Sequence, residues 1–376
     1  MAKQNFVPSP AKIKVIGVGG AGCNAVNRMI QADIHGVDFI QANTDAQALM
    51  LCLAPNVVQL GEKCTKGLGS GGDNNTGSKA TEESRDDIKD LLKGADMVFI
   101  AAGMGGGTGT GGAPVIAEIS RDVGALTIAV VTRPFTFEGV HRRDVAEDGL
   151  EKLVGHVDTL IIVPNDRLLQ LCDSKVSVDS AFKMADDALR QGVQSIAEVI
   201  TVPGMINLDF ADVKSIMKDA GPAWMSIGHA AGQNRAVDAA KAAISSPLLD
   251  CSIEGAKGVV FTVSGGSSLM LHEVREAADI IAKAVDPAAN IIFGVNFDPN
   301  MDEDVKITLI ATGFMQKRGP MSKPKEQEIR QALTQSLKDE STLDVPAFLR
   351  MPPSHHRKQA MAEAMKSALN RGAPGN

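Results

Sequence analysis

Short apolar runs alternate with stretches of helical periodicity through the first half of the chain. Six runs have the length of β-strands: 12–18, 37–42, 57–60, 96–102, 125–132 and 157–163. Helical patterns separate them, and strands that alternate with helices in this way pack as a parallel sheet covered by helices on both faces. Residues 11–175 are therefore predicted to form an α/β domain of the parallel-sheet, Rossmann-like kind.

One long helical pattern follows this domain. Between residues 176 and 202 the apolar positions recur at intervals of three and four, and Pro203-Gly204 ends the pattern. Strand-length runs resume at 258–264, 289–296 and 305–314, with helical stretches near 234–245 and 270–285. We expect a central helix at 176–202 that joins the first domain to a smaller α/β domain at 203–316.

Beyond Phe314 the chain becomes polar and charged, so residues 317–342 are predicted to be a disordered linker and residues 1–10 a flexible N-terminus. Residues 343–350, LDVPAFLR, form a short apolar island, which composition alone does not distinguish from a frayed terminus. In 351–376 apolar residues recur at helical spacing beside basic ones. The segment reads either as a basic amphipathic helix or, preferably, as a disordered basic tail.

A glycine-rich loop follows the strand at 96–102 directly. The segment MVFIAAGMGGGTGTGG (97–112) contains glycines and two threonines in and around this loop, and Ala113-Pro114 then reads as a helix start. Backbone N–H groups that lack neighbouring Cβ atoms can surround an anion, and a helix N-terminus favours negative charge. The segment indicates a phosphate-binding loop.

Two further glycine-rich segments narrow the class of ligand. Gly17, Gly19 and Gly22 match the G-x-G-x-x-G spacing of a dinucleotide fold, with Asp45 placed to serve as its acidic residue. A third segment, 67–77, is not needed for a dinucleotide, and several phosphate-facing loops suit a triphosphate better. The chain has no G-x-x-x-x-G-K-[ST] motif. Backbone N–H groups and a metal ion are expected to hold the phosphates.

Several segments together resemble the FtsZ family of tubulin-like cell-division GTPases. They are GVGGAGCNAVNRM (17–29), NTDAQAL (43–49), GMGGGTGTG (103–111), the pair Asn165-Asp166 and NLDFADV (207–213). The resemblance covers about residues 11–316 and the short motif at 343–350. It implies the tubulin/FtsZ fold, GTP and GDP as ligands with Mg²⁺, GTP hydrolysis, and head-to-tail assembly of the chain with itself. It also implies docking of 343–350 onto membrane-tethering division proteins and a place at the mid-cell division ring.

Composition excludes other classes of function. The formal net charge is -7 and only 3% of residues are aromatic, which disfavours a nucleic-acid-binding protein. No apolar run approaches the length of a membrane span, and the N-terminus lacks a signal-peptide core, so a cytoplasmic protein is expected. The five cysteines are scattered without C-x-x-C spacing, which argues against a disulfide framework or a zinc site.

The base of a nucleotide is assigned to the long helix. Phe182 and Asp186 are four residues apart and project from one face, so the ring can stack on a purine while the carboxylate accepts the two adjacent N–H donors of guanine. The alternative is that Phe182 belongs to the core and Asp186 is a solvated helix charge. The resemblance supports base contacts at both positions, with Asn24 and Asn165 as further partners.

The phosphate and ribose contacts are assigned largely by the resemblance, with Glu138 and Arg142 near the ribose and phosphates and Asp45 near Mg²⁺. The remaining cofactor-binding residues are expected in the glycine loops and at the end of the second strand: Gly20, Ala21, Gly22, Asn43, Gly71, Gly72, Gly103, Gly105, Gly106, Gly107, Thr108, Gly109 and Thr110.

Hydrolysis is assigned to Asn207, Asp209 and Asp212. The two acids are three apart at a helix start and can orient a water, although an N-cap Asp with an acid three residues later is also an ordinary capping arrangement. The length of the preceding helix places them some 30 Å from the base end of their own subunit. We therefore expect them to complete the active site of a neighbouring subunit.

Two other functions remain open from the sequence. A NAD-dependent oxidoreductase built on Gly17, Gly19 and Gly22 would require a catalytic residue such as His229 or His272 in the second domain. A tubulin-like filament protein of plasmid partition would share the GTPase domain, but it has no obvious use for the docking peptide at 343–350.

Overall fold

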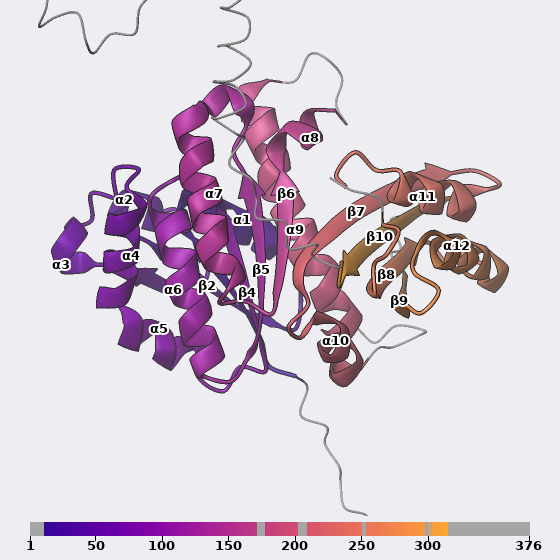
Figure 1. The fold of residues 1–376 in the computed structure, drawn as a ribbon, viewed down its shortest axis with the longest axis horizontal. Coiled ribbons are helices and arrows are strands. Elements are labelled where there is room, and N and C mark those ends of the chain that lie inside the picture. The colour runs from indigo at the N-terminus through magenta and orange to yellow at the C-terminus, as the bar shows by residue number, and fades with distance from the viewer. Residues whose placement is uncertain are drawn as a thin grey trace, which may run out of the picture. The chain divides into compact units, whose positions relative to one another are not determined.

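The computed structural model describes residues 11–170, 177–201, 209–249, 253–297, 301 and 303–314, which belong to one compact unit, Met1–Met315. A ten-stranded sheet runs through this unit in the order β3-β2-β1-β4-β5-β6-β7-β10-β8-β9 (Figure 1). The predictions for 1–10, 317–342, 343–350 and 351–376 lie outside the described residues. The predicted domain boundaries near 175 and 203 remain predictions.

The first six strands of this order are parallel to one another. They are β3 (Asn56–Gln59), β2 (Val37–Asn43), β1 (Ile13–Val18), β4 (Met97–Gly103), β5 (Leu126–Arg133) and β6 (Thr159–Pro164). In register, Ile13 lies between Val37 and Met97. The parallel direction brings the carboxyl ends of β1, β4 and β5 to one edge, where the glycine loops begin.

Helices cover both faces of the parallel strands. Val15 and Ile16 are adjacent on β1, yet they belong to two different apolar clusters, so the strand is buried on both sides. One cluster packs against α1 (Gly19–Gln31), α9 (Val178–Thr201) and α10 (Phe210–Met217). The other packs against α4 (Asn74–Glu83), α5 (Arg85–Leu92), α6 (Thr108–Asp122) and α7 (Val140–Val154).

Four short helical segments follow strands or loops near these faces. They are α2 (Ala46–Leu49), α3 (Glu62–Thr65), the 3₁₀ helix η1 (Thr136–Glu138) and α8 (Asn165–Leu169). Asp166 joins two of them, because its carboxylate accepts hydrogen bonds from the backbone N–H and the hydroxyl of Thr136, at 2.9 and 2.5 Å. This contact fixes η1 beside the start of α8.

The second half of the sheet is mixed. It contains β7 (Gly221–Ala231), β10 (Asp304–Thr312), β8 (Gly258–Gly265) and β9 (Asn290–Phe297), with α11 (Arg235–Ile244) and α12 (Leu271–Ala284) packed on it. β10 is antiparallel to both β7 and β8, whereas β8 and β9 are parallel. The predicted fold class, a parallel-sheet domain joined by a long helix to a smaller α/β domain, is confirmed.

β7 was not predicted from the sequence. Its residues, GPAWMSIGHAA, are mostly small or polar and show no regular alternation. The strand is defined by long-range pairing: Gly221 to Ala223 pair with β6, and Trp224 to Ala231 pair with β10. It therefore connects the two halves of the sheet.

Two local expectations were wrong. α6 begins at Thr108, not at Ala113-Pro114, so Pro114 lies inside the helix and both threonines of the glycine loop belong to its first turn. The third glycine-rich segment ends at Asp73, because the Asp73 carboxylate accepts hydrogen bonds from the N–H groups of Asn75 and Thr76 and caps α4. In both places residues that were expected in a loop begin a helix.

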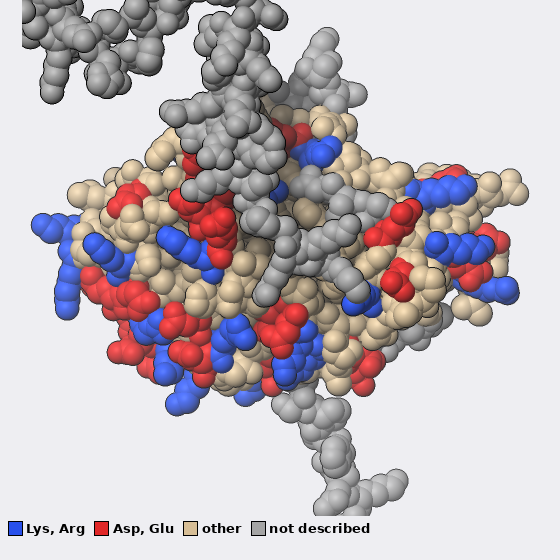
Figure 2. All heavy atoms as spheres, in the orientation of Figure 1, with Lys and Arg blue, Asp and Glu red and all other residues tan. Residues whose placement is uncertain are grey.

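The surface seen in Figure 2 carries charges of both signs. Lys and Arg side chains alternate with Asp and Glu over the region of α5 and the neighbouring end of α6. Arg85 lies in this region and makes ion pairs with Glu82 at 2.8 Å and Glu118 at 3.0 Å. In the part of the chain that the structure describes, no helix combines the length and apolar character needed to cross a membrane.

Candidate functional site

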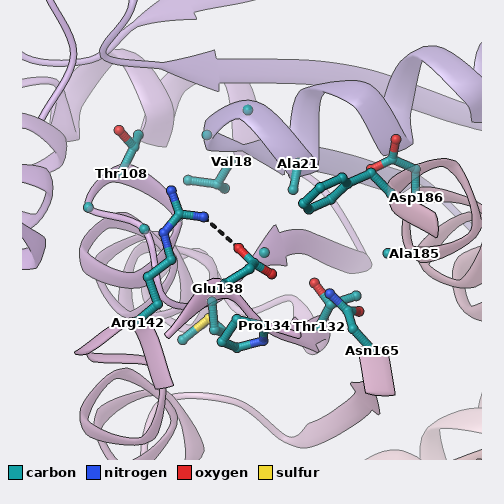
Figure 3. A pocket seen from close by; sticks show the side chains of 18 of the residues that line it. Val18, Ala21, Thr108, Thr132, Pro134, Glu138, Arg142, Asn165, Ala185 and Asp186 are labelled. Carbon is teal, nitrogen blue, oxygen red and sulfur yellow. Dashed lines mark hydrogen bonds and ion pairs between the residues drawn. The ribbon is translucent and has the colours of Figure 1, made fainter. Parts of the chain in front are cut away.

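A cavity of about 250 Å³ opens at the carboxyl ends of β1, β4 and β5 (Figure 3). Such edges of parallel sheets are where ligands of doubly wound folds bind. The cavity is lined by Val18, Gly19, Gly20, Ala21, Ser70, Gly103, Met104, Gly106, Gly107, Thr108, Gly109, Thr132, Pro134, Glu138, Arg142, Asn165, Phe182, Ala185 and Asp186.

One end of the cavity is built from backbone. β4 leads through Gly103 to Gly107 into α6, whose first-turn N–H groups have no partners within the helix. Gly105 has a φ of 96°, which an L side chain rarely adopts, and its N–H donates to the Thr110 hydroxyl at 2.8 Å. The helix N-terminus and the glycine backbone together form a site suited to a phosphate group.

Thr108 connects three loops at this end. Its Oγ1 lies 2.6 Å from the hydroxyl of Thr44, which follows β2, and 3.0 Å from the hydroxyl of Ser70, which precedes α4. Thr108 and Thr44 are buried. This hydrogen-bonded chain of hydroxyls holds the glycine loop against its two neighbours and preorganises the backbone.

The opposite end of the cavity carries side chains from α8 and α9. Phe182 is 41% exposed, while Asp186 is only 9% exposed. Phe182 meets Phe135 edge to face, with ring centroids 5.5 Å apart. These exposures contradict the alternative in which Phe182 is a core residue and Asp186 is a solvated charge.

Asn165 completes this end. Its side chain is buried, and within the described part of the chain its Oδ1 has no hydrogen-bond partner. A buried polar atom without a partner is costly unless a ligand satisfies it. In Figure 3 Asn165 and Asp186 lie on the side of the cavity opposite Thr108. An aromatic ring, a carboxylate and an amide can together stack on and hydrogen-bond a heterocyclic base.

The carboxyl group of Asp186 is held in an unusual environment. Burial raises its pKa to about 6, and the Arg28 guanidinium, whose Nε lies 3.5 Å from Oδ2, acts in the opposite direction. Arg28 is on α1, so this ion pair links α1 to α9. At neutral pH the carboxyl group is ionised and can accept hydrogen bonds.

In Figure 3 Glu138 lies between the two ends, and Arg142 lies on the same side as Thr108 with its guanidinium directed toward Glu138. Glu138 accepts a hydrogen bond from the backbone N–H of Phe135 at 2.8 Å and pairs with Arg142 at 2.5 Å. Arg142 also borders a second cavity of about 350 Å³, which shares Gly106 with the first. The second cavity is further lined by Gly71, Gly72, Asp73, Asn74, Gly105, His141 and Val145.

Most of the predicted ligand-binding residues therefore border one of two adjoining cavities. Five do not. Gly22 packs against β4, where a Cβ atom would collide with the carbonyl oxygen of Ala101. Thr110 is buried and accepts the Gly105 N–H, and Asn43 accepts the N–H of Asp45 at 3.3 Å. Asn24 is exposed on α1.

Asp45 caps α2, because its Oδ1 accepts the N–H groups of Gln47 at 2.9 Å and Ala48 at 3.4 Å. Within the described residues no group of three or more His, Cys, Asp or Glu side chains is arranged to hold a metal ion. The roles of these five residues, including Asp45 near Mg²⁺, remain predictions.

The expected hydrolytic residues lie elsewhere. Asp209 is the N-cap of α10, with its Oδ1 accepting the N–H of Asp212 at 2.9 Å, so the capping interpretation describes a real contact. Both acids are exposed and neither borders the two cavities. Asn207 lies outside the described residues.

Sequence reasoning assigned no GTP contact to the remaining residues that line the first cavity, of which Gly19 was named only for the dinucleotide spacing: Val18, Gly19, Ser70, Met104, Thr132, Pro134 and Ala185. Val18, Thr132 and Pro134 lie at or just beyond the ends of β1 and β5, so the rule that ligands bind at carboxyl ends of parallel strands could have found them. Ala185 adjoins Asp186 and gave no chemical indication of its own.

Comparisons with known proteins identify the family of the chain. The model of the tubulin/FtsZ family GTPase domain matches residues 12–173, and that of the FtsZ family C-terminal domain matches 221–315. The empty FtsZ dimer of M. jannaschii is 44% identical, with a TM-score of 0.79, over 82% of this chain and 89% of that one. The chain belongs to the FtsZ family.

Other solved structures show the same fold. A point variant of M. jannaschii FtsZ is 44% identical over 81% of this chain and 92% of its own, with a TM-score of 0.79. CetZ2 from Haloferax volcanii, 21% identical over 87% of this chain and 99% of its own with a TM-score of 0.69, shares the fold. Membership of the tubulin/FtsZ family makes the chain a GTP-binding GTPase.

Neither His229 nor His272, which the oxidoreductase alternative requires, borders the first cavity.

Proposed function

We propose that this FtsZ-family GTPase is a cell-division protein that assembles head to tail, forms a cytoplasmic ring at the division site, and hydrolyses GTP at the junction between neighbouring copies. The observation that carries the proposal is the separation of two half-sites. The nucleotide cavity and the acids of α10 lie toward opposite ends of one long helix.

The length of α9 makes this separation quantitative. The helix has 24 residues, which corresponds to a length of about 36 Å at 1.5 Å per residue. Phe182 and Asp186 lie in its first half, and Asp209 follows its end. Figure 1 places α8 and α10 at opposite ends of the view. Asp209 and Asp212 are therefore assigned to the γ-phosphate of the next copy rather than to that of their own chain.

The surroundings of the cavity support a contact with a second copy. Large apolar side chains are exposed on loops and short helices near it, including Met50 at 83%, Leu68 at 85% and Phe137 at 60%. Exposed apolar side chains that gather in one region mark contact surfaces. When one end of a molecule contacts the opposite end of the next, the contact does not close and an open filament results. The M. jannaschii relative with 44% identity is likewise an FtsZ dimer in its solved structure.

Binding would place guanine against Phe182, Asp186 and Asn165, and the phosphates along the glycine backbone of α6. Glu138 and Arg142 would contact the ribose and phosphates, which requires their mutual ion pair to rearrange. A phosphate-bound Mg²⁺ needs only one or two protein carboxylates, so the scarcity of clustered ligands among the described residues is compatible with it, and Asp45 is the carboxylate expected nearby. Such an ion neutralises developing charge on the phosphates.

Asp209 and Asp212 would supply the groups that orient the attacking water, a role that is assigned to no residue lining the cavity. Asp209 caps α10 and fixes its first turn, from which the exposed Asp212 carboxylate projects. Presented to a neighbouring cavity, the pair would orient a water for attack on the γ-phosphate, and Asp212 would accept hydrogen bonds from that water. Asn207 is expected to assist. Hydrolysis to GDP is thereby coupled to assembly.

Recruitment to membranes is assigned to residues 343–350, which would dock onto membrane-tethering division proteins. The match to the FtsZ family C-terminal domain supports division rather than plasmid partition as the process served. An initial experiment is 90° light scattering after addition of GTP, GDP, ATP and NAD in turn. Assembly with GTP alone supports the proposal, whereas nicotinamide binding without GTP binding contradicts it.

A complementation experiment tests the shared active site. Asp212→Ala keeps its own nucleotide cavity but offers a defective α10, while Asp186→Ala offers an intact α10 but binds GTP weakly. The GTP concentration is kept too low to fill the Asp186→Ala cavity. Under this condition each variant alone should hydrolyse little GTP. Mixed in equal amounts, they should regain activity at about a quarter of the junctions if assembly is random and head to tail.

A mixture of Asp212→Ala with Asp209→Ala is the matched control, because both variants then offer a defective α10 and no junction is competent. If the acids act within their own chain, the Asp212→Ala and Asp186→Ala mixture also stays inactive. That result, obtained while the mixture still assembles, would contradict hydrolysis at the junction.

A further inference from the structure

Two cysteines are neighbours near the start of α1, the helix whose first residues line the nucleotide cavity. Cys23 follows the phosphate loop in α1 and is buried, while Cys52 follows α2 and is partly exposed. The Cys52 thiol is close enough to the Cys23 thiol for each group to affect the pKa of the other. The Cys23 thiol also contacts the carbonyl oxygens of Gly17 and Ala42, each at 3.8 Å. The two cysteines, which are 29 residues apart in the sequence (52 minus 23), are thus neighbours in the fold.

A hydrogen-bonded network keeps Cys52 at this place. Asn27, one helical turn after Cys23, donates through Nδ2 to the carbonyl oxygen of Leu51 at 3.0 Å. Its Oδ1 accepts the N–H of Leu53 at 2.9 Å. The residues on both sides of Cys52 are therefore tied to the same side chain of α1. Because positions i and i+4 of a helix share a face, this attachment holds Cys52 against Cys23.

Gln41 on β2 also bonds to both α1 and the loop after α2. Its amide nitrogen donates to the Cys23 carbonyl oxygen at 2.7 Å and to the Asn27 Oδ1 at 3.0 Å, and its Oε1 accepts the N–H of Ala54 at 2.8 Å. Gln41 is fully buried. A buried amide that bridges α1 and the loop after α2 holds the two segments that carry the cysteines beside each other.

We propose that Cys23 and Cys52 are an oxidation site at which a peroxide forms an intramolecular disulfide. Hydrogen peroxide first oxidises the accessible Cys52 thiol to a sulfenic acid and is itself reduced to water. The Cys23 sulfur then attacks Cys52 Sγ, the S–S bond forms, and the sulfenic oxygen leaves as a second water. Two thiols and one peroxide give one disulfide and two waters.

The chemical environment assigns this order of events. Burial raises the pKa of Cys23, and the neighbouring Cys52 raises it further. Burial also raises the pKa of Cys52, but the hydrogen bond from Cys23 acts in the opposite direction. Thiolate character and access decide which sulfur reacts first with a peroxide. Cys52 has more of both, and Cys23 is the resolving thiol.

The disulfide would alter the surface assigned to assembly, a consequence that rests on the proposed function. Sulfur atoms in a disulfide are about 2.0 Å apart, much closer than two thiols in contact. The loop of Cys52 must therefore move relative to α1, and Met50, Leu51 and Leu53, which are exposed, move with it. We expect the oxidised chain to assemble less with GTP and to recover on reduction.

Peptide mapping tests the bond without reference to GTP. Trypsin cuts after Lys14, Arg28 and Lys63, so residues 15–28 and 29–63 each carry one of the two cysteines. The native full-length chain is treated briefly with peroxide, alkylated and digested. These two peptides should then be recovered as one linked species, whose mass is two hydrogen atoms below the sum of the two reduced peptides. The species should disappear on treatment with dithiothreitol.

Cys64 provides the matched control, since its thiol is exposed and lies on a separate short helix. Cys64→Ala should still form the linked species, and Cys52→Ala should not. Light scattering with GTP should fall severalfold after oxidation of the native chain and of Cys64→Ala, but not of Cys52→Ala. Absence of the linked species, or its formation with unchanged assembly of a chain that does assemble, would overturn the proposal.

Discussion

Asp186 is the residue to which base recognition is assigned most directly in the proposed function. Its carboxylate is buried beside Arg28, and the exposed ring of Phe182 lies one turn earlier on the same helix. The neighbouring Asp187 has another role, because its Oδ1 accepts the Arg190 guanidinium at 2.6 Å. Two adjacent acids of identical chemistry thus have different partners because a helix points them in different directions.

We expect Asp186→Ala to weaken GTP binding by about 1 to 3 kcal/mol, since the guanine donors lose their acceptor. The selectivity for GTP over ATP should fall at the same time. Fluorescence titration with both nucleotides measures the two effects, and Asp187→Ala is the matched control that should keep both. Unchanged GTP affinity and unchanged ATP rejection in Asp186→Ala would show that another group reads the base.

The raised pKa of Asp186 makes the stability of the empty protein depend on pH. Because its pKa of about 6 lies above the ordinary 3.8, the folded state holds this proton more tightly than the unfolded state. The stabilisation is fully present below pH 3.8 and is lost as the pH rises through 6. At pH 7 an ionised carboxylate remains partly buried.

Asp186→Asn should therefore unfold at a higher urea concentration than the native chain at pH 7, by an amount equivalent to roughly 2 kcal/mol. The difference should shrink toward pH 4. Urea titrations without nucleotide at several pH values measure it, with Asp187→Asn as the control for loss of charge on the same helix. If the difference in stability between Asp186→Asn and the native chain does not vary with pH, the pKa of Asp186 is not raised in the folded state.

At the scale of elements, α10 combines a structural and a proposed catalytic role in one turn. Asp209 caps the helix through the N–H of Asp212, and both acids are exposed. Capping alone would explain the spacing of the two acids. The two roles can be separated, because Asn caps helices about as well as Asp but carries no charge.

We expect Asp209→Asn to retain its stability and to lose most GTP hydrolysis, whereas Asp209→Ala should lose hydrolysis and also about 1 kcal/mol of stability. Urea unfolding and phosphate release measured on the same preparations give both quantities. If Asp209→Asn hydrolyses GTP like the native chain, Asp209 serves only as a cap and catalysis depends on Asp212.

At the scale of the whole molecule, function is expected to divide between the compact unit and the segment that follows it. The nucleotide cavity, the acids of α10 and the exposed apolar residues all belong to residues 11–314. The docking peptide at 343–350 follows the predicted linker. Assembly and recruitment to membranes are therefore predicted to be separable.

Deletion of residues 343–376 should leave GTP-driven assembly close to the native level, since none of the expected interface lies there. The same deletion should abolish recruitment to vesicles that carry a tethering partner through the apolar anchors Phe348 and Leu349. Light scattering and vesicle sedimentation measure the two properties. Phe348→Ala alone should reproduce the sedimentation defect, and loss of assembly would show that the segment belongs to the folded body.

The sequence alone was sufficient for the local features. Apolar runs with β periodicity predicted nine of the ten strands in the described residues to within a few positions, and the glycine loop after β4 indicated a phosphate site. These features depend on a residue and its near neighbours, since burial on both faces of a strand requires a continuous apolar run. Phe182 and Asp186 could be paired because helix geometry alone brings them to one face.

Tertiary structure decided what depends on partners distant in the sequence. β7 became a strand through its pairing with β6 and β10, and α6 began at Thr108 in a position where Thr44 and Ser70 contact its first hydroxyl. Only folding exposed Phe182 while burying Asp186, and only folding brought Cys23 to Cys52. Burial and side-chain contact depend on residues from several strands at once, and no local pattern in the sequence specifies them.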